Sequence, residues 1–222
     1  VNGIMVEGKS KQMRELRQNV GLVFQYPEHQ LFEETVYLDI AFGPKNLGCS
    51  ESEIEQRIKE SMELVGLDYE IIKERSPFEL SGGQRRRVAI AGVLAMKPKI
   101  LILDEPTAGL DPRGRDEILG QIHELHKKYN LTIILVSHSM EDIAKLVGRI
   151  IVMNQGKIAL DGTPEEVFKY SEELNEMGLA VPNITRLMKR LRAAGMDVPE
   201  TIFTVEKAKE IIMEKLRGDS NA

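Results

Sequence analysis

The sequence lacks several features that would each point to a particular class of protein. Its 222 residues contain no tryptophan and one cysteine, Cys49. One cysteine excludes an internal disulfide and fits a reducing compartment. No run of about 18 apolar residues occurs. We therefore expect a soluble chain whose membrane role, if it has one, comes through a partner.

The chain also has fewer positively charged residues than negatively charged ones. Thirty Lys and Arg residues face 35 Asp and Glu residues, which gives a formal net charge of −5. A dedicated nucleic-acid binder uses Lys and Arg to neutralise phosphates, so this balance argues against one. The basic run Arg85–Arg87 could be a phosphate-binding patch or the solvated face of a helix, and the net charge favours the helix face.

Short apolar runs alternate with longer helical segments along the chain. Val20–Phe24 and Lys99–Leu103 are typical of buried strands, and Leu131–Val136 is a third strand. This alternation predicts an α/β fold with a parallel sheet. Further along, a hairpin is expected at 149–160 and helices beyond Gly162. The remaining helices are expected at Glu53–Val65, Gly83–Met96 and Gly114–Tyr129.

Each of the three predicted strands is followed by polar residues. The first strand leads to Gln25, the second to Asp104 and Glu105, and the third to Ser137 and His138. Parallel α/β sheets bind ligands at the carboxyl ends of their strands. These side chains therefore predict a functional site at one edge of the sheet.

The acidic pair suits metal-assisted phosphate chemistry. A Mg²⁺ ion bound to phosphates needs one or two carboxylates, and Asp104 suits this role. Glu105 could orient and deprotonate the water that attacks a terminal phosphate. The alternative is an ordinary strand end that caps the next helix. Pro106 and the segment Ala108–Asp111 follow directly and favour the functional interpretation.

The segment Leu80-Ser81-Gly82-Gly83-Gln84 is a second candidate site. Its glycines stand beside a serine at a predicted helix start, where backbone N–H groups and the helix dipole can face an anion. A generic capped helix is the alternative. Its position sixteen residues before the strand that ends in Asp-Glu-Pro-Thr favours the binding role.

Together, LSGGQ, ILILDEP, AGLD and the strand into Ser-His resemble an ATP-binding-cassette (ABC) ATPase, over roughly residues 1–165. The segments FQYPEHQLFEETV and DEPTAGLDPRGR are most similar to ATPase subunits of energy-coupling factor transporters. The resemblance implies Mg²⁺-ATP as ligand and a role for each matching position. Those roles are the Q-loop and metal residue Gln25, the signature Leu80–Gln84, the Walker B metal residue Asp104, the catalytic base Glu105, the D-loop Ala108–Asp111 and the switch histidine His138.

The resemblance also implies an architecture. The fold would be a P-loop NTPase-type mixed sheet with a helical signature subdomain, and incomplete at its N-terminus. Four regions follow from it: a β-subdomain remnant and strand (1–25), a helical signature subdomain (26–96), a RecA-like core (97–162) and a helical C-terminal extension (163–222).

A transport role follows from the same resemblance. It implies an ATP-hydrolysing subunit that powers uptake of a vitamin or metal ion, peripheral to the cytoplasmic face of the membrane. Its partners would be a second ABC ATPase subunit, identical or related, a transmembrane coupling protein and a substrate-binding membrane component, with no nucleic acid. Two alternatives stay open: a degenerate, regulatory ABC subunit and a DNA-linked ABC ATPase.

The stretch GIMVEGKS (Gly3–Ser10) matches the phosphate-binding P-loop pattern. Only two residues precede Gly3, too few for a buried strand of about five residues. Nine residues separate Ser10 from Val20, whereas a strand-to-strand crossover needs a dozen or more. We therefore interpret the match as accidental, and expect a chain without a P-loop that is inactive alone. Truncation and natural degeneracy would both explain this.

Overall fold

The computed structural model describes residues 16–129 and 131–219, and the chain forms two compact units. The first unit comprises residues 1–136 and the second comprises residues 137–222. The four-region division expected from the sequence stays a prediction. Among the described helices, none has the length and apolar character that crossing a bilayer requires.

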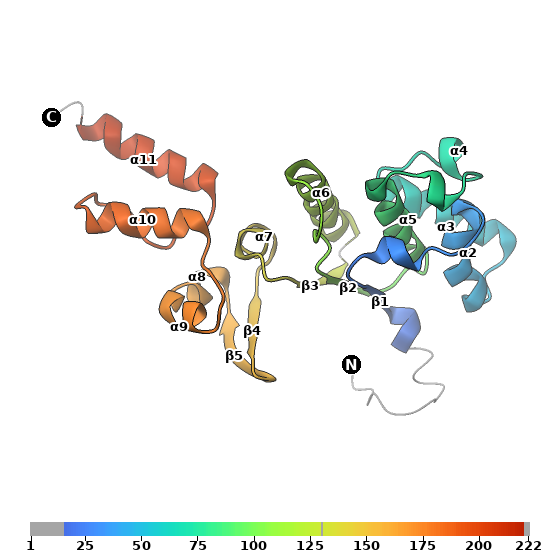
Figure 1. Cartoon of the computed structure of the whole chain (residues 1–222), viewed down its shortest axis with the longest axis horizontal. Coiled ribbons are helices and arrows are strands. Elements are labelled where there is room, and N and C mark those ends of the chain that lie inside the picture. The colour runs from blue at the N-terminus through green and yellow to red at the C-terminus, as the bar shows by residue number, and fades with distance from the viewer. Residues whose placement is uncertain (1–15, 130, 220–222) are drawn as a thin grey trace. The chain divides into compact units, whose positions relative to one another are not determined.

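A parallel sheet forms the centre of the first unit (Figure 1). Its three described strands, β1 (Val20–Val23), β2 (Ile100–Asp104) and β3 (Thr132–Val136), lie side by side in that order. Both pairings are parallel, with Val23 beside Leu103 and Leu103 beside Leu135. The α/β prediction is therefore confirmed, and all three strands end at the same edge.

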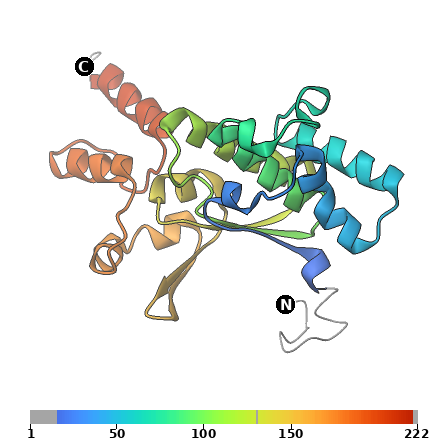
Figure 2. The same ribbon diagram turned by 45° about the vertical axis from the view of Figure 1, so that its right-hand side comes forward.

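Among the described residues of the first unit, helices cover one face of this sheet. Helices α5 (Gly82–Leu94) and α6 (Pro112–Tyr129) lie on the same side of it (Figures 1 and 2). Leu103 on this face is 1% exposed, whereas Leu22 and Ile134 on the opposite face are 39% and 47% exposed. The prediction of buried strands is therefore right for one face only, because described helices cover one face.

The remaining helices of the first unit gather at one end, beside α5 (Figure 1). They pack around Ile40, Ile58 and Val88, each 0% exposed. The elements between β1 and α5 are η1 (Pro27–Gln30), α2 (Val36–Leu47), α3 (Glu51–Leu64), α4 (Tyr69–Ile72) and η2 (Pro77–Glu79). The helices expected at Glu53–Val65 and Gly83–Met96 are confirmed as α3 and α5.

The turn between α2 and α3 holds the single cysteine. Gly48 has a φ of 82°, the left-handed conformation that ends many helices. The Cys49 N–H donates to the Pro44 carbonyl oxygen at 3.2 Å, and its thiol is partly exposed. Ser50 then caps α3, because its hydroxyl oxygen accepts from the Glu53 N–H.

The second unit begins with α7 (Met140–Leu146) and a hairpin of β4 (Ile150–Asn154) and β5 (Lys157–Gly162). The hairpin confirms the prediction. Gln155 and Gly156 both have positive φ, as a two-residue hairpin loop of type I′ requires. The helices α8 (Pro164–Val167), α9 (Ser171–Glu176), α10 (Asn183–Ala193) and α11 (Val205–Asp219) follow.

Two small cores stabilise the second unit. Phe168 and Leu174 belong to the larger core, around the hairpin and α9. Ala208 of α11 packs with Met188 and Val198 in the smaller one. Helix α11 also has apolar side chains outside this core, since Val205 and Leu216 are 60% and 49% exposed.

Candidate functional site

Gln25 lies in the loop that leaves β1. One residue, Phe24, separates it from the last residue of the strand, and its side chain is exposed. The next residue, Tyr26, has φ 56° and ψ 56°, a left-handed conformation that is uncommon for any residue except glycine. This sharp turn directs the chain into η1 immediately after Gln25.

Asp104 and Glu105 follow the neighbouring strand. Asp104 is the last residue of β2 and pairs in register with Val136 of β3. The Glu105 N–H donates to the Val136 carbonyl oxygen at 2.9 Å, and Glu105 has a φ of 45°. Strained left-handed residues of this kind cluster at functional sites. The strand therefore ends abruptly at Glu105, and both acids lie at the carboxyl edge of the sheet.

The loop from Glu105 to Asp111 is folded tightly. The Ala108 N–H donates to the Glu105 carbonyl oxygen at 3.0 Å, and Gly109 has a φ of 74°. Asp111 accepts a hydrogen bond from the Gly114 N–H on Oδ1 at 2.9 Å. The acid that caps α6 is therefore Asp111. Asp104 and Glu105 do not cap this helix, so the alternative interpretation of them as helix caps is wrong.

The Leu80–Gln84 segment forms the start of α5. Leu80 is buried, and Ser81 forms a reciprocal capping box with Gln84. The Ser81 hydroxyl oxygen accepts from the Gln84 N–H at 3.3 Å, and Gln84 Oε1 accepts from the Ser81 N–H at 3.1 Å. Within the described chain, the N–H groups of Gly82 and Gly83 make no hydrogen bond. They are thus open to an anionic ligand.

Arg86 is a residue whose role the sequence interpretation missed. The prediction of a solvated helix face is wrong at this position, because its side chain is only 2% exposed. Its guanidinium group forms an ion pair with Glu28 at 2.9 Å. The charge run was the only local signal, and it could not reveal a partner 58 residues away.

His138 follows β3 by two residues and belongs to the second unit. Its side chain is exposed. The next residue, Ser139, caps α7, since its hydroxyl oxygen accepts from the Asp142 N–H. The first unit therefore brings Gln25, Asp104 and Glu105 to one sheet edge, while the histidine lies at the start of the second unit.

The donor set fits a magnesium ion carried by a nucleotide. The Asp104 carboxylate and the Gln25 amide oxygen are hard oxygen donors of the kind that Mg²⁺ takes. In the part of the chain that is described, no group of three or more His, Cys, Asp or Glu could hold a metal by itself. A site of this kind needs phosphate oxygens and water to complete its coordination.

The segment Gly3–Ser10 lies outside the described residues. Its interpretation as a chance match to the P-loop pattern therefore stays a prediction. The described chain shows β1 beginning at Val20, after a short helical stretch that includes Leu16.

Comparisons with known proteins agree on one family. A family model described as ABC transporter matches residues 2–108. The chain is 60% identical, over 220 residues, to the energy-coupling factor transporter ATP-binding protein EcfA2 of Clostridium perfringens, and covers 77% of that protein. It is 52% identical, over 212 residues, to the protein of the same name from Bacillus subtilis and covers 76% of it. These matches span 99% and 95% of the present chain.

A solved structure is also similar. It is cbiO1 from Clostridium perfringens, described as part of the ABC transporter complex cbiONQ. The two chains superpose with a TM-score of 0.68 at 40% sequence identity. The match covers 83% of the present chain and 72% of the other.

Proposed function

This chain belongs to the ABC transporter ATPases, among the ATP-binding proteins of energy-coupling factor transporters, and we propose that in the full-length protein its sheet edge binds and hydrolyses Mg²⁺-ATP. The observation that supports this most directly is the placement of Gln25, Asp104 and Glu105 after adjacent parallel strands. Ligands of open α/β sheets bind at this edge.

Each residue at this edge has a distinct part in the proposed reaction. Asp104 would hold the ion through a water molecule, and Gln25 would contribute an amide oxygen to it. Glu105 accepts the proton of the water that attacks the terminal phosphate. When bound, Mg²⁺ neutralises charge on the phosphate oxygens. The hydrogen bond from the Glu105 N–H to Val136 supports this assignment, because it fixes the backbone of the base.

We propose that the remaining site residues act with a second ATPase subunit. The open N–H groups of Gly82 and Gly83 bind a phosphate of ATP held by that subunit, and Asp111 lies at the contact between the two. His138 has a separate proposed role, as the switch histidine that senses the terminal phosphate. The capping box of Ser81 and Gln84 supports this role, because it fixes the first turn of α5 without using the glycine N–H groups.

The proposed membrane partner is a transmembrane coupling protein at the cytoplasmic face, with a separate membrane component that selects a vitamin or metal ion. Exposed aromatic side chains support a docking surface on the first unit. Phe32 and Phe42 are 59% and 48% exposed, and their rings meet edge to face at 5.1 Å between centroids. We call the exposed pair Phe32 and Phe42 the aromatic surface.

Glu105→Gln tests the catalytic assignment in the full-length protein assembled with its ATPase partner. The amide cannot accept the proton of water, so hydrolysis should fall by about 10²- to 10⁴-fold. Binding of Mg²⁺-ATP should change little. Glu124→Gln, at an exposed position on α6, is the matched control and should leave hydrolysis unchanged.

An unchanged rate of hydrolysis and transport in Glu105→Gln would contradict the assignment. The chain would then act as a regulatory subunit of its transporter. A loss of both binding and hydrolysis would instead make Glu105 a ligand-binding residue rather than the base.

A further inference from the structure

The side chain of Arg86 connects three segments of the first unit. It lies on the second turn of α5, shortly after the Leu80–Gln84 segment, and is 2% exposed. Its polar contacts all go to the loops that follow β1 and β2. A buried guanidinium is costly unless hydrogen bonds and an opposite charge compensate it. Arg86 has both.

The first connection is to the loop after β1. Arg86 Nε donates to Glu28 Oε2 at 3.0 Å, and an Arg86 Nη donates to Glu28 Oε1 at 2.9 Å. Two parallel bonds of this kind fix the relative orientation of the two groups as well as their distance. The guanidinium carbon also lies 5.9 Å from the centroid of the Tyr26 ring. Tyr26 directly follows Gln25.

The second connection is to the loop after β2. The other Arg86 Nη donates to the carbonyl oxygens of Pro106, at 3.1 Å, and Ala108, at 2.9 Å. Both residues lie between Glu105 and Asp111. The two loops also meet directly, because a Cβ built on Gly109 would lie 3.2 Å from Tyr26 Cε1. One side chain therefore bonds to the segments that carry Gln25 and Glu105.

We propose that Arg86 is a positioning residue. It fixes the loops that carry Gln25 and Glu105 relative to the first turn of α5. The inference rests on the proposed ATPase function and extends it to a residue whose polar contacts in the described chain are to Glu28, Pro106 and Ala108. Movement of α5 would be transmitted through Arg86 to the loops that hold the base and the metal ligand. Misplacing catalytic groups by about 1 Å can lower a rate by about 10²-fold.

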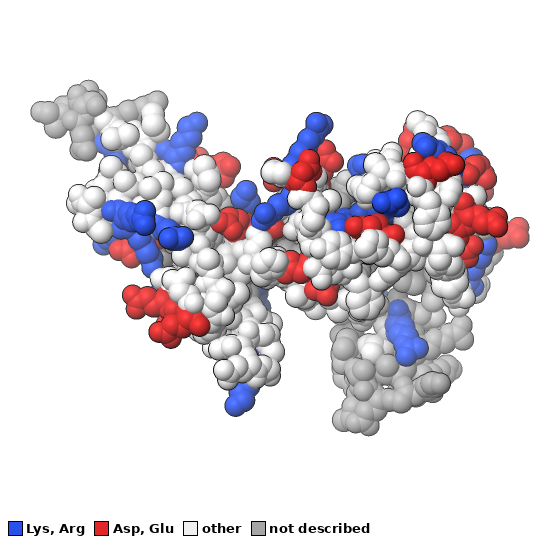
Figure 3. Space-filling model, viewed as in Figure 1, with Lys and Arg blue, Asp and Glu red and all other residues white. Residues whose placement is uncertain are grey.

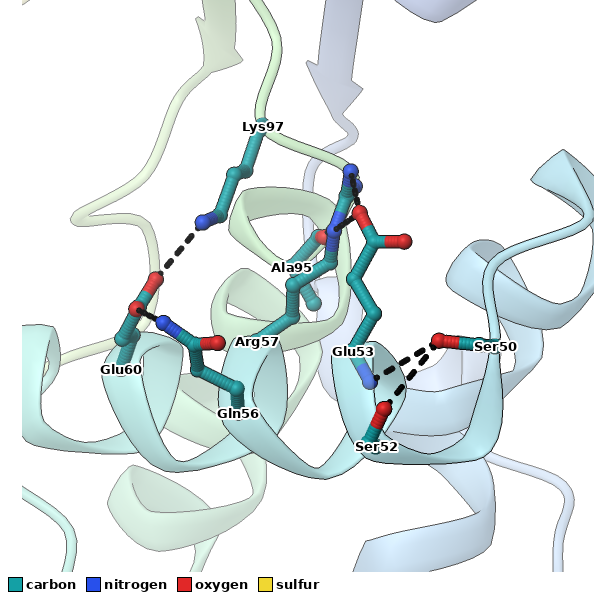
Figure 4. Close-up of polar contacts among 8 residues, drawn as sticks. All are labelled: Ser50, Ser52, Glu53, Gln56, Arg57, Glu60, Ala95 and Lys97. Carbon is teal, nitrogen blue, oxygen red and sulfur yellow. Dashed lines mark hydrogen bonds and ion pairs between the residues drawn. The ribbon is translucent and has the colours of Figure 1, made fainter.

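Arg57 provides a matched comparison, because it makes the same kind of contacts elsewhere (Figure 4). Its guanidinium group donates to Glu53 Oε1 at 2.7 and 3.1 Å and to the Ala95 carbonyl oxygen at 3.2 Å. It thus links α3 to the end of α5, and none of these contacts is to the loops that carry Gln25 and Glu105. A purely structural arginine and a positioning arginine can be told apart by comparing the two.

The experiment uses the full-length protein assembled with its ATPase partner and measures kcat and KM for ATP. Lysine keeps the charge of Arg86 but cannot bond to Glu28 and two carbonyls at once. Arg86→Lys should lower kcat by about 10- to 100-fold and change KM by less than about 3-fold. Arg57→Lys should leave both values unchanged.

A second variant keeps the test decisive if Arg86→Lys fails to fold. Glu28→Gln removes the partner from the other side and leaves Arg86 in place. Glu28→Gln and Arg86→Lys together should lower kcat no more than the stronger single change, because both break one connection. Circular dichroism spectra and melting temperatures establish whether each variant is folded.

The possible results distinguish a failure of the positioning role from a failure of the proposed ATPase function. A parent complex that hydrolyses no ATP would overturn the proposed function. An active parent with a normal kcat in both Arg86→Lys and Glu28→Gln would overturn the positioning role alone. Equal losses of kcat in Arg86→Lys and Arg57→Lys would also overturn it, since general loosening of the helices would explain both.

Discussion

At the scale of single residues, Glu28 is a carboxyl group whose charge depends on its neighbour. Burial alone would raise its pKa, but the hydrogen bond from Arg86, backbone hydrogen bonding and the charges of Arg86 and His29 hold the pKa below its ordinary value of 4.5. A pKa lower in the folded than in the unfolded state means that ionised Glu28 stabilises the fold. That stabilisation is present above the ordinary value and is lost as the pH falls through the lowered value.

Glu28→Gln should therefore change the response of the fold to acid. Near pH 7 the variant should unfold at a lower urea concentration than the parent, because Arg86 remains buried without its partner. As the pH falls through the lowered pKa of Glu28, the difference should shrink, because protonation neutralises Glu28 in the parent. Urea unfolding followed by circular dichroism measures both values. A difference independent of pH would contradict the assignment of charge to Glu28.

Lys9→Ala tests the interpretation of Gly3–Ser10. Because β1 begins at Val20, too few residues follow Ser10 for the crossover helix that a P-loop needs. The affinity of the 222-residue chain for Mg²⁺-ATP, measured by calorimetry, should therefore be the same with and without the lysine side chain. Tight binding by the parent that Lys9→Ala abolishes would make the segment a genuine P-loop.

At the scale of elements, Gly21 sets the distance between β1 and the helix above it. A Cβ atom at this position would lie 2.7 Å from Val93 Cγ1 and 3.1 Å from Pro98 Cγ. Gly21→Ala should therefore lower the free energy of unfolding by about 1–3 kcal/mol. Gly120→Ala is the control, because Gly120 is exposed on α6 with open space around it. There the change should raise helix stability by up to about 1 kcal/mol.

Urea unfolding at constant pH measures both glycine variants. Equal stability of Gly21→Ala and the parent would mean that Val93 and Pro98 move aside without cost. A destabilised Gly120→Ala variant would mean that an unrecognised contact covers this face of α6.

The elements themselves were largely predictable. Apolar runs bounded by turn residues placed the strands that end near Gln25, Asp104 and Val136 to within about two residues. Their polar neighbours share one edge because parallel strands run in the same direction, which the order of elements implies. Ser81 and Gln84 were recognisable as a helix start because a capping box has a local sequence pattern.

What the sequence did not reveal depends on contacts between distant segments. The exposed face of the sheet was missed because an apolar run such as 20–24 is typical of a strand covered on both sides. The burial of Arg86 depends on packing between α5 and η1, which local charge patterns do not encode. The left-handed φ of Glu105 occurs beside a hydrogen bond from its N–H to β3, another distant contact.

At the scale of the whole molecule, the helical end of the first unit combines charge with exposed aromatic side chains. Acidic side chains gather over α3 and α4 on the face seen in Figure 3. Glu55, Glu63 and Glu70 are exposed members of this group. The exposed aromatic rings suit a partner segment that has an apolar face, and the carboxylates on the same end of the unit suit one that is also basic.

Replacing both residues of the aromatic surface with serine should uncouple the assembled transporter. Loss of the buried rings at an interface weakens docking, while the sheet edge stays intact. Substrate uptake in vesicles should fall several-fold more than Mg²⁺-ATP binding by the isolated subunit. Tyr129→Ser is the control, since Tyr129 is 50% exposed at the end of α6. Unchanged uptake in the double variant would place the docking surface elsewhere.

The turn between α2 and α3 has a practical consequence for studying movement. Cys49 offers a thiol at the surface of a turn whose backbone is hydrogen-bonded to the preceding helix. A maleimide spin label would therefore attach at one known place among these 222 residues, with no cysteine to remove. Pulsed electron paramagnetic resonance between two labelled copies could then follow the helical end of the first unit through a cycle of nucleotide turnover.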